Sequence, residues 1–315
     1  MIYYRTAKNT DKDQILDFCK TTFEWGDYIH EVWDIWMKEK DGLLMVAVID
    51  DELSNNKKTI AMIHGIVYDE TIWVEGIRVN PQFRKKGIAS EMVSKIVEYG
   101  KERNAKLASA VVSVKNNPSN ELMNKLNFIP KEKWIYSTMK TINDKYLSFE
   151  KIKRAEIKDK KIIESFLARS EGINFTDKIR FVQAWRWYTL TGDLLNKIII
   201  NGQLYIYVDD KVRGIVIIDT DRYFNKANYE IGYLEGETQE IVSNLIGYCL
   251  FMANSHKSQN NKNFEIKEII NLNDLDNDFN QKMNIFCPDT KINFETLRDY
   301  EINVSSKFIV YDKKL

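Results

Sequence analysis

Cysteine is scarce in this 315-residue sequence, and its distribution argues against a disulfide framework. The three cysteines, Cys19, Cys249 and Cys287, are scattered, and no two of them form a Cys-x-x-Cys pair. An odd number of isolated cysteines is typical of proteins from a reducing compartment. We therefore expect a cytoplasmic protein.

Long apolar runs and an excess of charge are also missing. The longest apolar run, residues 245–253, is far shorter than the roughly 20 residues that a membrane-spanning helix needs. The opening, MIYYRTAKNTDKDQ, lacks the apolar core of a signal peptide. Basic and acidic residues number 46 each, so the formal net charge is zero. The sequence thus predicts no membrane association, no secretion and no nucleic-acid partner.

The sequence has only three histidines. His30, His64 and His256 do not cluster with cysteines or carboxylates at the spacing of metal ligands. His64 falls within an expected strand, where an ordinary packed histidine is the simpler interpretation. The sequence therefore predicts no metal.

The chain does contain enough apolar residues, 44%, to build two cores at roughly 150 residues per domain. Hydrophobic periodicity predicts alternating strands and helices. The expected strands of the first half are 2–6, 43–49, 59–68, 71–79, 107–114 and 133–140, with helices near 15–23, 28–38, 87–103 and 119–126. After the charged stretch 150–161 we expect helices at 161–168, 181–188 and 238–253, with strands at 203–208, 212–219 and 228–234.

The second half repeats features of the first. Trp33 and Trp36 precede GLLMVAVIDD and IWVEGIRV, whereas Trp185 and Trp187 precede GQLYIYVDD and NYEIGYLE. We therefore predict an α+β fold with two similar units in tandem, residues 1–145 and 150–315, each a mostly antiparallel twisted sheet flanked by helices.

The segment WVEGIRVNPQFRKKGIA, residues 73–89, carries the clearest sign of function. A strand ends at Val79, and the basic run from Arg84 to Lys86 leads through Gly87 into a long helix. Glycine lets the backbone turn tightly and approach a ligand. The first amides of a helix have no partners within it, and they favour a phosphate. The segment predicts an anion site, with a solvated basic turn as the alternative.

Residues 84–89 resemble the Arg/Gln-x-x-Gly-x-Gly/Ala signature of the GNAT superfamily of acyl-CoA-dependent N-acetyltransferases. Downstream, VSVKNNPSNELMNKLNF resembles the family's strand, asparagine and short helix ending in Leu-Gly-Phe. Asn116 takes the asparagine position, and Asn127 stands where the family has glycine. Two motifs in the right order make the resemblance specific over about residues 1–140. Residues 74–79 with Asp27-Tyr28 also resemble the histidine N-acetyltransferase-like branch.

The resemblance implies acetyl-CoA as co-substrate, attacked directly by an amine in a ternary complex. Pantetheine would lie along the strand that ends at Val79, and main-chain amides near Gly87 would hold the diphosphate. The residues implied for this binding are Ile77, Arg78, Val79, Arg84, Lys85, Lys86, Gly87, Ile88, Ala89, Ser90 and Asn116.

Glu75 is the candidate general base. Strand alternation predicts that it shares a face with Trp73, Ile77 and Val79, beside the acetyl group. The attacking ammonium, with a pKa of about 10, must lose a proton, and a positioned carboxylate can take it. The alternative is a structural carboxylate that binds Arg78.

The usual general acid of the family is a tyrosine on the short helix. Met123 occupies that position here and cannot donate a proton, which leaves Tyr136 or a water as candidates. On the acceptor side, Asp27, Tyr28 and Glu31 would form an acidic and aromatic wall that suits an amine. The alternative is a solvated helix face.

The second half lacks the phosphate signature. Residues 236–240, GETQE, place two acids where a diphosphate would lie. We therefore expect a degenerate GNAT-like domain that binds no cofactor. For the whole chain we expect an N-acetyltransferase acting on a primary amine of a small molecule, such as an amino acid. The alternatives are a protein N-terminal or lysine acetyltransferase and a non-catalytic acyl-CoA sensor. The sequence leaves open whether the protein forms a homodimer.

Overall fold

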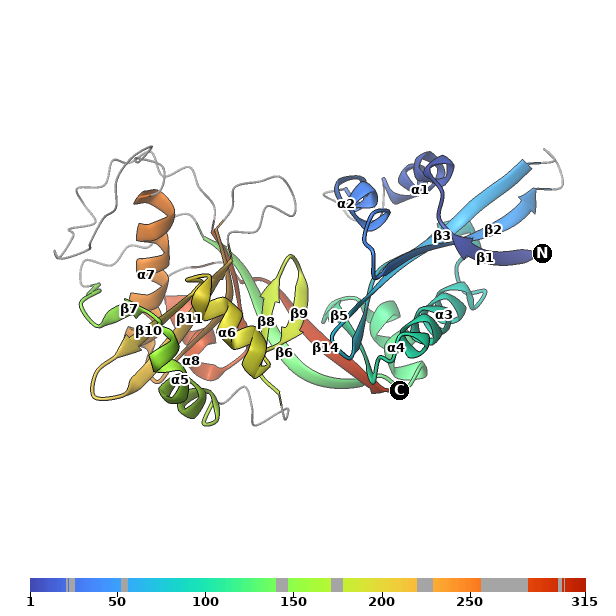
Figure 1. Ribbon diagram of the computed structural model, residues 1–315. Helices are drawn as coiled ribbons and strands as arrows, with labels where there is room; N and C mark the ends of the chain where they lie inside the picture. The colour runs from blue at the N-terminus through green and yellow to red at the C-terminus, as the bar shows by residue number, and fades with distance from the viewer. Residues whose placement is uncertain are drawn as a thin grey trace. The chain divides into compact units, whose positions relative to one another are not determined.

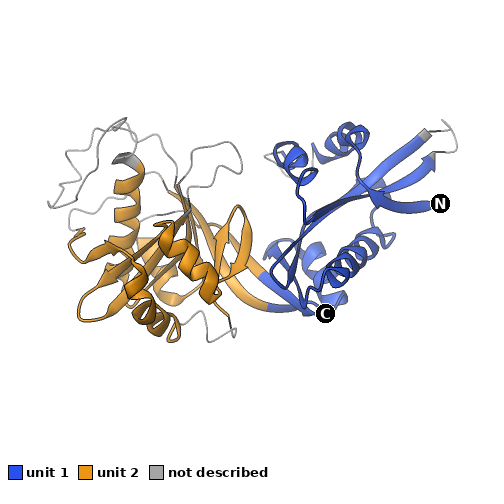
Figure 2. Cartoon of the chain, viewed as in Figure 1, with its two compact units in different colours: residues 1–130, 310–315 blue, residues 131–309 orange. Residues whose placement is uncertain are grey.

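The computed structural model describes residues 1–20, 22, 26–51, 56–139, 147–170, 178–219, 229–255, 283–299, 302 and 304–315. It divides into two compact units, coloured separately in Figure 2. The first unit is Met1–Pro130 with Val310–Leu315, and the second is Lys131–Ile309. This division differs from the predicted one, because residues 131–145 fall in the second unit and the C-terminal residues return to the first.

The sheet of the first unit runs in the order β1-β2-β3-β4-β5-β14. Neighbours are antiparallel from β1 to β4, and β4 pairs in parallel with β5. Figure 1 shows α1 and α2 on one face of this sheet and α3 and α4 on the other. The strands are β1 Ile2–Thr6, β2 Gly42–Asp51, β3 Asn56–Tyr68, β4 Thr71–Val79, β5 Leu107–Ser113 and β14 Val304–Lys314; the helices are η1 Asn9–Asp11, α1 Lys12–Cys19, α2 Ile29–Trp36, η2 Pro81–Phe83, α3 Ile88–Glu102 and α4 Asn117–Lys125.

Strand β14 ties the C-terminal residues into the first unit. The buried Ser109 hydroxyl donates to Asp312 at 2.7 Å, and the Tyr311 hydroxyl donates to Asn120 on α4 at 3.1 Å. Deleting residues 150–315 would therefore remove part of the first unit together with the second.

The second unit has the sheet order β14-β6-β13-β12-β11-β10-β7 and a separate hairpin, β8-β9. Its large helix α7 contributes much of the core, with Leu245 and Ile246 fully buried. The elements are β6 Ile129–Met139, β7 Ile152–Arg154, η3 Ile157–Asp159, α5 Lys160–Leu167, β8 Arg180–Gln183, β9 Arg186–Thr189, α6 Gly192–Ile200, β10 Leu204–Val208, β11 Val212–Asp219, β12 Tyr229–Gly236, α7 Gln239–Ser255, β13 Met283–Pro288 and α8 Lys291–Asp299.

The helix predicted for residues 181–188 is wrong. These residues form the β8-β9 hairpin, and its turn places Ala184 and Trp185 at φ values of 51° and 62°. A stretch of only eight residues can fit either period, and its four aromatic side chains favour a strand. The hairpin buries Trp187 against Trp134, with ring centroids 5.9 Å apart. Helix α6 was not predicted.

The two units repeat the same local device at their start. In η1, Asp11 accepts a hydrogen bond from the Lys8 amide at 2.7 Å, and in η3, Asp159 accepts one from the Glu156 amide at 3.0 Å. Each aspartate also accepts from a basic residue on the preceding strand, Arg5 or Lys153. The similarity predicted from the sequence thus extends to particular hydrogen bonds.

We expect the Asp11→Asn variant to lose stability in a pH-dependent way. Burial opposes the charge of Asp11, but hydrogen bonds from Arg5, the Lys8 amide and Thr59 outweigh it and lower the pKa. A pKa below the unfolded value stabilises the fold above about pH 4, and this stability is lost as the pH falls through the folded pKa.

Urea unfolding at several pH values checks this prediction. At pH 7 the free energy of unfolding should fall by about 2 kcal/mol, because hydrogen bonds to a charged group are lost. The gap between wild type and variant should shrink as the pH is lowered below about 4. A gap that is independent of pH would contradict the assignment.

No helix in the described parts of the chain is long and apolar enough to cross a membrane.

Candidate active site

A β-bulge in β4 sets the geometry of the site. His64 of β3 pairs with Glu75 of β4, and Met62 pairs with Arg78, so one β3 residue faces two residues of β4. Paired residues on antiparallel strands lie on the same face, and His64 and Met62 are two residues apart. Glu75 and Arg78 therefore share the face toward α1 and α2.

Glu75 therefore shares a strand face with Trp73, as predicted. The prediction that it shares this face with Ile77 and Val79 is wrong. Val79 pairs with Ala61, on the opposite face from His64 and Met62. The strict alternation assumed from the sequence fails because a bulge adds one residue and reverses the side-chain direction after it.

Gly76 makes the bulge possible. Its φ is +67°, in the left-handed region, and a Cβ built there would lie 2.6 Å from the ring atoms of Trp36. Any side chain at this position would meet both backbone strain and a clash.

Glu75 binds a histidine rather than standing alone. Its Oε1 lies 2.8 Å from Nδ1 of His64, and Nε2 of the same ring lies 3.2 Å from Oε2 of Glu39. His64 is fully buried, whereas the Glu75 side chain is 14% exposed. The ring stacks on Trp36 with centroids 4.6 Å apart and planes 5° apart. The structure thus brings together a group that the sequence analysis did not find.

Arg78 forms a second charged contact on this face. Its Nε and Nη2 donate to the two oxygens of Asp27 at 2.7 and 3.1 Å, and Asp27 is 4% exposed. The guanidinium also lies 5.2 Å from the ring centre of Tyr28. Burial works against the charge of Arg78, but Tyr28 and Asp27 outweigh it and raise the pKa of Arg78. Burial disfavours the charged form of Tyr28 and so raises the pKa of its hydroxyl.

The Arg78→Met variant should be strongly destabilised. It would leave the buried carboxylate of Asp27 without its guanidinium, and breaking a buried pair costs about 3–5 kcal/mol. The double variant R78M/D27N should recover much of that loss, because it removes the buried charge as well. Chemical denaturation measures both values, and a single variant as stable as the wild type would contradict this role of the pair.

The basic segment after β4 is exposed and leads directly into α3. Arg84 donates from Nε to the Val79 carbonyl at 3.1 Å, and Lys85 adopts a φ of +61°. Gly87 is the N-cap at φ +79°, and a Cβ built on it would meet nothing within 4 Å. The first helical hydrogen bond at this end runs from the Glu91 amide to the Gly87 carbonyl. The amides of residues 88–90 belong to the first turn, where helices leave donors unsatisfied.

The downstream motif has a structural role as well. Asn116 is exposed and caps α4 by accepting from the Ser119 amide at 3.2 Å. Asn127 adopts the left-handed φ of +59° that its place in the family motif requires. The contact of Asn116 with pantetheine stays a prediction.

The candidates for a general acid occupy different places. Met123 is buried in the first unit. Tyr136 belongs to the second unit, where its hydroxyl donates to Asn284 at 3.2 Å, and burial raises its pKa. On the acceptor side, Glu31 lies on α2 with Oε1 3.7 Å from His30.

The second unit has its own cavity at the end of β12. It has a volume of about 360 Å³ and is lined by Phe166, Arg169, Ser170, Glu235, Gly236, Glu237, Thr290 and Ile292. β12 follows an antiparallel strand and precedes α7, as β4 does before α3. Thr290 caps α8 through the Asn293 amide, as Asn116 caps α4.

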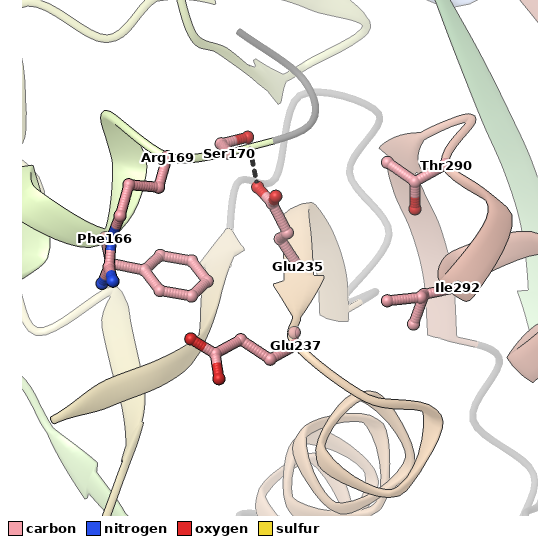
Figure 3. A pocket seen from close by; sticks show the side chains of 8 residues that line it. Phe166, Arg169, Ser170, Glu235, Glu237, Thr290 and Ile292 are labelled. Carbon is pink, nitrogen blue, oxygen red and sulfur yellow. Dashed lines mark hydrogen bonds between the residues drawn. The ribbon is translucent and has the colours of Figure 1, made fainter. Parts of the chain in front are cut away.

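Figure 3 shows two carboxylates in this cavity, on Glu235 and Glu237. Glu235 accepts from the Ser170 hydroxyl at 2.6 Å, and Glu237 pairs with Lys211 at 3.2 Å. Arg169 also lines the cavity, and Glu237 pairs with Arg213 as well as with Lys211. That this unit binds no acyl-CoA therefore stays a prediction.

Comparison with known proteins defines the class. The Acetyltransferase (GNAT) family model matches residues 12–128. An uncharacterized N-acetyltransferase of Methanocaldococcus jannaschii is 26% identical over 139 residues, which make up 40% of this chain and 62% of that protein. The chain therefore spans less than two thirds of this curated relative.

Two solved structures match both units. A GCN5-related N-acetyltransferase from Sphaerobacter thermophilus matches with a TM-score of 0.60 and 11% identity, covering 99% of this chain and 95% of that one. A GCN5-related glucosamine N-acetyltransferase region of a fungal multi-domain GH3 β-N-acetylglucosaminidase also gives a TM-score of 0.60, with 10% identity, 99% of this chain and 38% of that one covered. At such identities the likeness shows the fold, and the predicted α+β class is confirmed.

Residues 12–128 form an acetyltransferase domain of the GNAT family. The family resemblance predicted from the two sequence motifs is therefore confirmed, and both motifs lie within or at the edge of the matched region.

Proposed function

We propose that this protein is an acetyl-CoA-dependent N-acetyltransferase whose acceptor is a primary amine of a small molecule, such as an amino acid. The observation that carries the proposal is the bulged strand β4, which places a partly exposed carboxylate upstream of a glycine-capped, basic helix start. The carboxylate supplies a base, and the helix start supplies an anion site.

The start of α3 fits the diphosphate of coenzyme A. Its amides are in the first turn, its N-cap Gly87 adds no side chain, and Arg84, Lys85 and Lys86 are exposed beside it. Helix N-termini with free donors and a nearby positive charge bind phosphates. We assign diphosphate binding to the main chain of residues 85–90, with Arg84 and Lys86 adding charge. Backbone groups of Ile77–Val79 would bind pantetheine.

The reaction needs proton acceptors and a leaving group. Glu75 takes a proton from the ammonium directly or through a water, and the neutral amine nitrogen then attacks the thioester carbon. The nitrogen passes its second proton to water, and the carbon–sulfur bond breaks to release the thiolate of coenzyme A. The buried Met123 cannot protonate that thiolate. A thiol with a pKa of about 8.5 can leave as the thiolate, so a dedicated acid is not essential.

The acceptor would approach the face of the sheet that carries α1 and α2. Tyr28 and Glu31 on this side offer an aromatic ring and a carboxylate for an amine. Both oxygens of Asp27 accept from Arg78, so we assign Asp27 to positioning Arg78 rather than to direct contact with the substrate. Three free, buried cysteines fit a protein that works in the cytoplasm.

A thiol-release assay tests the proposal. Purified protein is mixed with acetyl-CoA and a panel of amino acids, other small amines and short peptides, and the appearance of free coenzyme A is followed. We expect turnover with at least one small amine. Turnover confined to peptides would favour a protein acetyltransferase. Tight binding of coenzyme A without turnover on any amine would favour an acyl-CoA sensor and contradict the proposed catalysis.

A further inference from the structure

We propose that His64 is a positioning residue for the catalytic carboxylate, and that Glu39 holds His64 in that role. This inference rests on the proposed function of Glu75 as the base. The three residues come from three elements or their borders: Glu39 precedes β2, His64 lies on β3 and Glu75 on β4. Their contacts run in one line, from Glu39 through the imidazole to Glu75.

His64 forms a hydrogen bond to Glu75, the proposed base. Nδ1 of His64 lies 2.8 Å from Oε1 of Glu75, and the two residues are cross-strand partners directly before the bulge. An N–H at Nδ1 would donate to the carboxylate and fix its rotation. The bond therefore orients Glu75 at the point where β4 changes direction.

The imidazole of His64 is buried among its neighbours. His64 has no exposed surface, so it cannot contact an acceptor or acetyl-CoA itself. A buried polar ring is costly unless its nitrogens have partners. The carboxylates of Glu39 and Glu75 supply one partner on each side, with Glu39 in an ion-pair contact at 3.2 Å rather than in an aligned hydrogen bond. His64 can thus act only through a neighbour.

The residues packed around the His64 ring restrict its rotation. Trp36 covers one face of the imidazole with nearly parallel planes. Gly42 lies so close to the far edge that a Cβ there would come within 2.9 Å of Nε2. The surrounding residues leave the ring little room to rotate. The orientation of Nδ1 toward Glu75 is therefore built into the packing.

The same three residues could be considered as metal ligands, since their ligand atoms lie within 4.8 Å of one another. However, the two carboxylates contact opposite nitrogens of one ring. The lone pairs of those nitrogens point away from each other, so one ion could not use both contacts. The arrangement fits a hydrogen-bonded line better than a metal centre.

Two isopolar variants separate positioning from simple packing. Asparagine at position 64 keeps a donor near the place of Nδ1, toward Glu75, whereas glutamine keeps one near the place of Nε2, toward Glu39. We expect H64N to retain kcat within about fivefold and H64Q to lose about 10²-fold, since a small misplacement of a catalytic group can cost that much. The KM for acetyl-CoA should stay unchanged in both variants.

A double-mutant cycle shows whether His64 acts through Glu75. If it does, E75Q/H64Q should be no slower than E75Q alone, because the oriented carboxylate is already absent. Thermal unfolding and coenzyme A binding of every variant confirm that the site is folded. E39Q is expected to reduce kcat less than H64Q, because it leaves the Nδ1 contact in place.

Equal losses in H64N and H64Q would overturn the inference, as would multiplied losses in the double variant. Both results would leave the proposed function standing, provided that E75Q itself is slow. An E75Q variant with full activity would instead remove the base on which both proposals depend.

Discussion

Replacing Glu75 by glutamine is expected to lower kcat by about 10²- to 10⁴-fold, the usual contribution of a positioned general base. The variant keeps the size of the side chain and a polar atom toward His64, but it cannot accept the proton of the attacking ammonium. The affinity for coenzyme A should not change, because the diphosphate segment of residues 84–90 is untouched. Steady-state thiol release with saturating acetyl-CoA measures the effect.

The pH dependence gives this prediction a second readout. An amine with a pKa of about 10 loses its proton in solution as the pH rises, so the deficit of the variant should shrink toward high pH. Glu70, which directly precedes β4, offers a matched control. Its side chain is 63% exposed and pairs with Lys106. Glu70→Gln should keep the wild-type rate. Equal rates for the Glu75 variant and the wild type at neutral pH would remove the assigned base.

Gly76→Ala is expected to damage both stability and turnover. The methyl group would meet the Trp36 ring at 2.6 Å, and alanine would have to hold a φ of +67°. Left-handed backbone costs about 1–2 kcal/mol and overpacking about 1–3 kcal/mol, so we expect a loss of about 2–5 kcal/mol in the free energy of unfolding. If the backbone of β4 instead relaxes to accommodate the methyl group, the bulge straightens and the position of Glu75 relative to Arg78 changes.

Gly192→Ala is the matched control for this effect. Its Cβ would meet only the end of Lys160 at 3.7 Å, and Gly192 lies at the start of α6. Urea unfolding should find this variant about as stable as the wild type. A second test combines Gly76→Ala with Trp36→Leu, which makes room for the methyl group. A Gly76→Ala protein with normal stability and rate would show that the bulge is dispensable.

The helix start at Gly87 could be predicted from the sequence because its signals are local. A strand that ends at Val79, a basic run and a glycine before an amphipathic stretch need no knowledge of distant residues. The same holds for Asn127, whose left-handed backbone follows from its place after a short helix. Both motifs lie on the predicted elements.

The bulge and the contacts of Glu75 could not be predicted in this way. Periodicity treats a strand as regular, so it places Val79 on the wrong face. The partners of Glu75 and Arg78 are distant along the chain: His64 is 11 residues away from Glu75, and Asp27 is 51 residues away from Arg78. Only the pairing of β3 with β4 and the packing of α2 bring them together.

The exchange of residues between the two units was also missed. Asp312 contacts Ser109 across 203 residues of sequence, and no local pattern near the C-terminus indicates a strand for the first unit. The 181–188 hairpin shows the complementary limit, since eight aromatic-rich residues fit a helix or a strand until a partner selects one.

Isothermal titration of the 315-residue protein tests the anion site most directly. Coenzyme A and pantetheine share the thiol arm, but only coenzyme A carries the diphosphate. We predict clear binding heat for coenzyme A, much weaker binding of pantetheine, and a coenzyme A affinity reduced at least tenfold in R84E/K86E, whose new carboxylates repel phosphate. Folded protein that gives no heat with millimolar coenzyme A, or that binds both compounds equally well, would contradict the account.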